Sequence, residues 1–162
     1  MKIIGIDPGT ARVGWAIITA AESKIHPLVY GCMTTKTHIS PQDRLLTIHK
    51  GITDLLSTHK PDHLALEALF FANNAKTVIP VGQSRGVILL AAAQQGIPVY
   101  SYSPKTVKNT ITGDGNAGKE QITSMVMRIL ALDTPPKPDD TADAIAIALT
   151  HAYSYKLKEK IK

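Results

Sequence analysis

The sequence predicts an α/β domain in which helices flank a five-stranded mixed sheet. Three observations support this prediction. The chain has 162 residues, of which 44% are hydrophobic, and this is the size and composition of one globular domain. Short β-branched runs and longer segments of helical periodicity follow one another in the order βββαβαβααα. Serine–proline pairs mark two helix starts, and glycine or proline residues mark most of the turns.

The N-terminal third predicts an antiparallel meander of three strands, followed by a helix. The expected strands are 2–7, 12–19 and 27–34. A Pro8–Gly9 turn ends the first of them. Ser40 and Pro41 supply a helix cap and a first helical residue, and the apolar residues after them keep helical spacing to about His59.

The rest of the chain predicts two more strands, parallel to the first, and four more helices. The expected strands are 62–67 and 97–101, and the expected helices are 76–95, 104–111, 119–132 and 140–155. A glycine-rich loop, 113–118, precedes the third of these helices, and prolines break the chain before the fourth. We expect one folded domain over residues 1–155 and a basic tail over residues 156–162.

Composition and charge narrow the classes of protein. Cys32 is the single cysteine, so no disulfide can form within the chain and a structural zinc site is disfavoured. No apolar run reaches the roughly 18 residues of a membrane span, and no basic and apolar leader precedes the first strand, so we expect a cytoplasmic protein with no membrane partner. The formal net charge is +5, and four lysines follow Tyr153. That basic tail suits either phosphate backbones or a solvated helix end.

Three acidic residues stand in apolar surroundings, where carboxylates are rare. Asp7 and Glu67 each end an apolar strand, and Asp143 interrupts an almost wholly apolar helix. Desolvating a carboxylate costs several kcal/mol or forces it to bind a proton unless a cation balances its charge. These apolar runs contain no lysine or arginine. A metal ion is the other available partner.

The predicted positions of the acids favour one shared metal site. Asp7 and Glu67 end strands expected to be parallel neighbours, and Asp140 and Asp143 are spaced i, i+3 on one helix face. An all-oxygen ligand set suits Mg²⁺ or Mn²⁺ and not zinc. Two such ions can hold the attacking and leaving oxygens of a phosphoryl displacement. Local explanations exist as well, because Asp7 is a common turn residue before Pro-Gly and Asp140 a common helix cap.

Several short motifs surround these acids in a fixed order. They are Ile6–Gly9, Arg12–Trp15, Leu66–Glu67, Asn73–Ala75, Gly82–Gly86 and Asp140–Ala148. Together they cover nearly the whole chain and resemble RuvC-type Holliday junction resolvases. The resemblance implies an RNase H-like fold and a homodimer that resolves four-way DNA junctions in recombination and repair by paired symmetric nicks. It also implies that Asp7, Glu67, Asp140 and Asp143 are the catalytic carboxylates and bind two Mg²⁺ ions per active site, with Mn²⁺ as a substitute.

The resemblance assigns DNA contacts as well. Lys108 and Lys119 match family lysines near the scissile phosphate, where a cation offsets charge in the transition state. We therefore expect Lys119 to be catalytic, and Lys105, Lys108 and Lys119 to bind DNA. Phe70 matches an aromatic that stacks on an unpaired base, although Phe71 fits this role equally. Family membership also suggests a branch-migration motor complex as a partner.

The predicted helix over 76–95 is the candidate dimer interface. Gly82, Gly86, Leu89 and Ala93 lie along it, and small residues allow a second helix to approach closely. Ordinary packing against the sheet is the alternative explanation of the same residues.

Four other functions share parts of this pattern. Gly113–Lys119 formally matches a phosphate-binding loop, which requires a strand before it and a Ser or Thr after the lysine. Here a helix is expected before the loop and Glu120 follows the lysine, so we reject nucleotide binding there. Other RNase H-like nucleases share the carboxylates. An actin-like or sugar-kinase-type ATP-binding domain also opens with Asp-x-Gly-Thr, but that class needs two such domains. A non-catalytic junction binder would not need all four acids.

Overall fold

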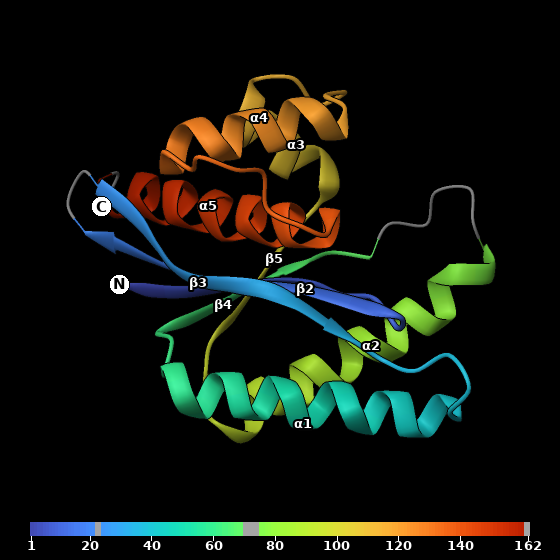
Figure 1. The fold of residues 1–162 in the computed structure, drawn as a ribbon. Coiled ribbons are helices and arrows are strands. Elements are labelled where there is room, and N and C mark those ends of the chain that lie inside the picture. The colour runs from blue at the N-terminus through green and yellow to red at the C-terminus, as the bar shows by residue number, and fades with distance from the viewer. Residues whose placement is uncertain (22–23, 70–74, 161–162) are drawn as a thin grey trace.

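A twisted central sheet lies between two layers of helices (Figure 1). The computed structural model describes residues 1–21, 24–69 and 75–160. The strands in these residues are β1 (Lys2–Asp7), β2 (Arg12–Ala21), β3 (Lys24–Thr34), β4 (His63–Glu67) and β5 (Val99–Tyr102). The helices are α1 (Pro41–His59), α2 (Ala75–Gln94), α3 (Pro104–Thr112), α4 (Lys119–Leu130) and α5 (Asp139–Lys160). The predicted α/β architecture is confirmed, element by element.

The sheet has the strand order β3-β2-β1-β4-β5. The first three strands form the predicted antiparallel meander, and β4 and β5 extend it in parallel with β1. Ile6 pairs with Leu66 in the parallel register. Because parallel neighbours end at the same edge of a sheet, Asp7 and Glu67 emerge side by side there, as the sequence predicted.

Two apolar cores separate the helices from the sheet. Residues of α1 and α2 pack on one face, and residues of α3, α4 and α5 pack on the other (Figure 1). Ser40 and Ser103 cap α1 and α3 through their side-chain oxygens, each one residue before a proline, which confirms both predicted helix starts. None of the helices in the described part of the chain combines the length and apolar character that a bilayer crossing requires.

Some element ends differ from the sequence prediction. Strand β3 begins at Lys24 and not at 27, and it tolerates Pro27 because it is an edge strand with a register shift at this point. Helix α5 continues to Lys160, five residues beyond its expected end, since lysine and glutamate are good helix formers. The helix therefore continues into residues 156–160, which belong to the expected basic tail.

Helix α5 approaches the sheet unusually closely at two glycines. A Cβ atom at Gly5 would lie 2.3 Å from the backbone oxygen of Ala144, and one at Gly14 would lie 1.8 Å from that of Asp140. Real Cβ atoms essentially never come within 3.0 Å of another heavy atom, so only glycine fits at either position. These contacts place the first turns of α5 directly over β1 and β2.

A buried polar cluster fixes the other half of α5. His151 is fully buried on this helix. Its Nε2 atom lies 2.9 Å from Nδ1 of His63 on β4, and its Nδ1 atom lies 2.7 Å from the Tyr102 hydroxyl on β5. Such directional contacts allow one alignment of the helix along the strands, whereas apolar packing alone tolerates sliding.

Candidate active site

A cavity of about 220 Å³ opens where β1 and β4 end beneath α5. Its walls are formed by Asp7, Glu67, Pro104, Val107, Lys108, Lys119, Ile122, Asp143 and Ile147. Three of the four predicted carboxylates and two of the predicted lysines therefore share one space. Two strands and three helices supply them, so the cavity exists only in the complete fold.

Asp7 and Glu67 are held by the ends of their strands. Asp7 pairs with Gly14 as the last residue of β1, and a tight turn follows in which a Cβ at Gly9 would lie 2.2 Å from the Arg12 backbone oxygen. Glu67 is the last residue of β4 and pairs with Tyr102 of β5. Regular pairing up to the final residue fixes the backbone of both acids, so their side chains leave from defined positions.

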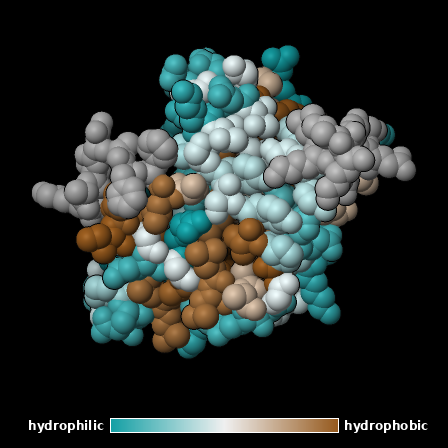
Figure 2. Space-filling view, turned by 180° about the vertical axis from the view of Figure 1, so that it is seen from behind, coloured by the Kyte–Doolittle hydropathy of each residue, from teal (hydrophilic) through white to brown (hydrophobic). Residues whose placement is uncertain are grey.

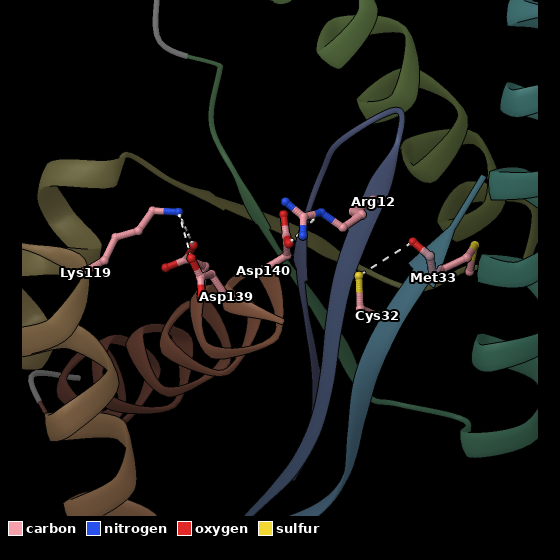
Figure 3. Close-up of polar contacts among 7 residues, drawn as sticks. Arg12, Cys32, Met33, Lys119, Asp139 and Asp140 are labelled. Carbon is pink, nitrogen blue, oxygen red and sulfur yellow. Dashed lines mark hydrogen bonds and ion pairs between the residues drawn. The ribbon is translucent and has the colours of Figure 1, made fainter. Parts of the chain in front are cut away.

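Asp140 and Asp143 come from the first two turns of α5 but point to different partners. Asp143 lines the cavity, and its Oδ2 atom lies 3.9 Å from Nζ of Lys119. Asp140 is absent from the cavity wall and faces Arg12, with 3.2 Å between Oδ2 and Nε (Figure 3). That buried oxygen accepts no hydrogen bond, so its contact with Arg12 is an ion pair of poor hydrogen-bond geometry.

The electrostatics of the cavity disfavour three ionised carboxylates. Burial, reinforced by the charges of Glu67 and Asp143, raises the pKa of Asp7 from 3.8 to about 8. Burial also raises the pKa of Glu67, where a hydrogen bond with the Asp7 side chain acts in the opposite direction. Burial raises the pKa of Asp143 as well, and the Lys119 charge opposes that rise. Without a cation, the cavity therefore retains a proton on Asp7 near neutral pH.

The predicted DNA-binding residues are only partly brought together. Lys108 and Lys119 line the cavity, and the exposed Nζ of Lys119 lies 3.8 Å from the Asp139 carboxylate (Figure 3). Lys105 lies outside the cavity wall, with its stem against Gly115. Phe70, like Phe71, falls outside the described residues, so the proposed stacking residue stays a prediction.

Arg12 and Arg85 contact the site, although we did not predict them as site residues. Arg12 pairs with Asp140, and Arg85 donates to the backbone carbonyl of Glu67 at 3.2 Å. Both belong to the motifs that carried the resemblance. The sequence did contain a signal for both residues. Each is an arginine within a motif of otherwise small or apolar residues, and such a cation needs a partner nearby.

The ligand chemistry of the cavity suits a hard divalent cation. Asp7, Glu67 and Asp143 offer only oxygen, and Asp140 holds a buried oxygen without a hydrogen-bond donor. In the described part of the chain, no three acidic, histidine or cysteine side chains are close enough to hold a metal as they stand. The residues therefore fit the ion in ligand chemistry, and side-chain rotation is required for three of the described residues to bind it together.

Comparisons with known proteins agree with the geometry. The family model described as crossover junction endodeoxyribonuclease RuvC matches residues 3–151. A protein of that name from Desulfitobacterium hafniense is 47% identical over 161 residues, which are 99% of this chain and 98% of the relative. A second, from Moorella thermoacetica, is 49% identical over 152 residues, which are 94% of this chain and 91% of the relative.

Solved structures give the same result. Thermus thermophilus RuvC, solved in complex with a Holliday junction substrate, matches with a TM-score of 0.92 and 34% identity over 98% of this chain and 96% of that one. The yeast mitochondrial Holliday junction resolvase Ydc2 shares the fold, with a TM-score of 0.68 at 16% identity over 97% of this chain and 82% of that one. The RNase H-like fold that the resemblance implied is confirmed. The chain belongs to the crossover junction endodeoxyribonuclease RuvC family.

Proposed function

We propose that this protein is a junction-resolving endonuclease that cuts four-way DNA by paired, symmetric nicks. One observation carries the proposal: on the RuvC scaffold, three carboxylates and two lysines line a single cavity at the carboxyl ends of β1 and β4. This combination can bind divalent cations and a phosphate together. Neither an ATP-binding domain nor a non-catalytic junction binder would need it.

Asp7, Glu67 and Asp143 are the proposed ligands of Mg²⁺, joined by Asp140, and Mn²⁺ has the same preference for oxygen. Two ions per active site would supply the charge that activates water and stabilises the leaving oxygen, leaving 5′-phosphate and 3′-hydroxyl ends. Lys119 and Lys108 reach the same cavity from α4 and α3 and are placed to neutralise the phosphate.

The second active site needed for paired nicks would come from a second copy of the chain. One face of α2 presents Ile79, Gly86 and Leu90 to solvent, and a Cβ at Gly86 would meet nothing within 4 Å. Apolar residues gather over this part of the surface (Figure 2). A twofold axis through this face would match the symmetry of the junction.

Leu90→Glu should convert the dimer to a monomer in sedimentation experiments, because it would bury two unpaired charges at the interface. Leu28→Glu is the matched control, since Leu28 is 52% exposed and Leu90 is 51% exposed, but Leu28 lies on the edge strand β3. A Leu90→Glu variant that sediments as a dimer would contradict this interface.

DNA affinity would come mainly from backbone phosphates. Lys105, Lys108 and Lys119 are the proposed contacts, and Phe70 is the proposed stacking residue at the junction centre. We also propose a cytoplasmic location and cooperation with a branch-migration motor complex, a partner that family membership suggests.

Asp143→Asn tests the catalytic assignment. If Asp143 ligates the metal, nicking of a synthetic junction in Mg²⁺ should fall by several orders of magnitude, because the metal supplies several kcal/mol of transition-state stabilisation. Junction binding in Ca²⁺ should survive, since less negative charge faces the phosphates. Asp139→Asn is the matched control. It removes the same charge, and Asp139 also contacts Lys119, at 3.8 Å, but lies outside the cavity wall. Equal nicking by Asp143→Asn and Asp139→Asn would remove Asp143 from the active site, and nicking that persists in EDTA would refute the metal requirement.

A further inference from the structure

Two polar side chains of α2 reach the ends of the strands that carry Asp7 and Glu67. They are Ser84 and Arg85, in the Gly-Gln-Ser-Arg-Gly segment, and the proposed chemistry assigns them no role. We propose that Ser84 and Arg85 are positioning residues that hold the strand ends bearing Asp7 and Glu67 at the spacing the metal site needs. This inference rests on the proposed function.

Arg85 forms hydrogen bonds with the end of β4 and with β5. Its Nε atom donates to the backbone carbonyl of Glu67 at 3.2 Å, and its Nη2 atom donates to the Ser101 hydroxyl on β5 at 2.7 Å. The pairing between β1 and β4 ends at Leu66, one residue before Glu67. Arg85 therefore supplies a donor to Glu67 just beyond the last β1–β4 pair. The planar guanidinium bridges two strands at once, which a single ammonium group does less well.

Ser84 forms a hydrogen bond with the turn after β1. It is fully buried, and its hydroxyl donates to the backbone carbonyl of Gly9 at 2.8 Å. Gly9 lies two residues after Asp7, in the tight turn described above. Because a buried hydroxyl without an acceptor is costly, this contact favours one position of the turn relative to α2.

The two contacts act on the face of the sheet opposite α5. Helix α5 brings Asp140 and Asp143 from one face, while Ser84 and Arg85 hold the backbones of Asp7 and Glu67 from the other. Ordinary packing of α2 needs neither a buried hydroxyl nor a guanidinium at these positions, since Ile88 on the next turn packs with apolar contacts alone.

Arg85→Met tests the proposal, because it keeps much of the apolar stem and removes both hydrogen bonds. The metal-free protein is titrated with Mn²⁺ in the absence of DNA, and binding is followed by water-proton relaxation. We expect Mn²⁺ affinity to fall about 10-fold, as is typical when a group that orients a metal ligand is lost. The Mg²⁺ concentration for half-maximal nicking should rise by a similar factor, and junction affinity in Ca²⁺ should stay within about 2-fold.

Arg44→Met is the matched control. Arg44 on α1 also donates to a backbone carbonyl, that of Thr37 at 2.8 Å, and its loss removes the same charge. Its Mn²⁺ affinity should equal that of the wild type. A folded Arg85→Met protein with unchanged Mn²⁺ affinity and only a lower Tm would overturn the proposal, because a purely structural residue gives that result.

Two milder variants keep the test decisive if Arg85→Met fails to fold. Arg85→Lys retains the charge and one donor and should weaken Mn²⁺ affinity less than Arg85→Met does. Ser84→Ala removes only the contact with Gly9 and should also weaken Mn²⁺ binding. Wild-type Mn²⁺ affinity in both would overturn the inference. Failure of the wild-type protein itself to bind Mn²⁺ or to nick junctions would instead refute the proposed function.

Discussion

Gly14→Ala should displace the N-terminal end of α5, which carries Asp140 and Asp143, while leaving the composition of the proposed active site unchanged. The added Cβ would lie 1.8 Å from the backbone oxygen of Asp140 and 2.4 Å from its carbonyl carbon. Backbone atoms cannot swing aside as a side chain can. The first turn of α5 must therefore retreat by about 1 Å or more before the contact becomes tolerable, and Asp140 and Asp143 move with it.

The expected losses of nicking rate and of stability follow from that displacement. A 1 Å misplacement of catalytic groups costs about 100-fold in rate, and overpacking a close contact costs about 1–3 kcal/mol of stability. The assay is single-turnover nicking of a labelled four-way junction in saturating Mg²⁺, with junction affinity measured in Ca²⁺. We expect a rate loss near 100-fold and little change in affinity, since the added methyl group lies beneath the helix and away from the lysines.

Gly31→Ala is the matched control for this experiment. It makes the same substitution in the neighbouring strand β3, but the three atoms nearest to its Cβ all belong to the Trp15 ring, the first at 3.0 Å, and a side-chain ring can shift. Its nicking rate and Tm should remain close to those of the wild type. If Gly14→Ala nicks within about 3-fold of the wild-type rate at an unchanged Tm, the proposed role of the close helix–sheet contact is wrong.

Three further predictions concern charge. In EDTA, the stability of the folded protein should fall as pH rises from about 4 to about 8. The reason is that Asp7, with a pKa of about 8 in the folded protein, keeps a proton that the unfolded chain has released. The Tm advantage of Asp7→Asn over the wild type should therefore grow with pH, and a constant difference would contradict this prediction. Lys119→Met should slow nicking strongly but change the free energy of unfolding little, since the ion pairs of Lys119 are exposed and 3.8–3.9 Å long. Normal nicking together with a large loss of stability in urea unfolding would instead show that Lys119 has a structural role. Deletion of residues 156–162 should flatten the dependence of junction affinity on salt if the tail binds phosphates, whereas an unchanged slope would assign the tail to solvent.

The sequence predicted the fold well where its signals were local. Strands, helix caps and glycine turns each depend on a few neighbouring residues, and every expected element is present. The acids at the ends of β1 and β4 were also predictable, because an apolar run that ends in a carboxylate is visible without the fold. Parallel pairing of these strands then brings Asp7 and Glu67 together.

The sequence could not predict contacts between distant segments. Asp140 and Asp143 have helical spacing, yet one faces Arg12 and the other faces the cavity, and this depends on how α5 rests on Gly14. Arg85 belonged to a motif that we identified, but its bond to the Glu67 carbonyl requires the position of α2 beneath the sheet. Such contacts leave no periodic pattern, so only the assembled structure shows them.

Cations and a proton of the protein itself balance the carboxylates of the site. Arg12 faces Asp140, Lys119 faces Asp143, and Asp7 retains a proton, with a pKa of about 8. Metal binding must therefore displace that proton, because a carboxylate ligand is deprotonated. We predict that Mn²⁺ affinity rises between about pH 6.5 and pH 8.5 and that calorimetry in buffers of different ionisation enthalpy shows proton release near neutral pH. Asp7→Asn should abolish most of this release even if some Mn²⁺ still binds. Binding of the metal by the wild-type protein without proton release would show that Asp7 is already ionised near neutral pH, and it would refute this prediction.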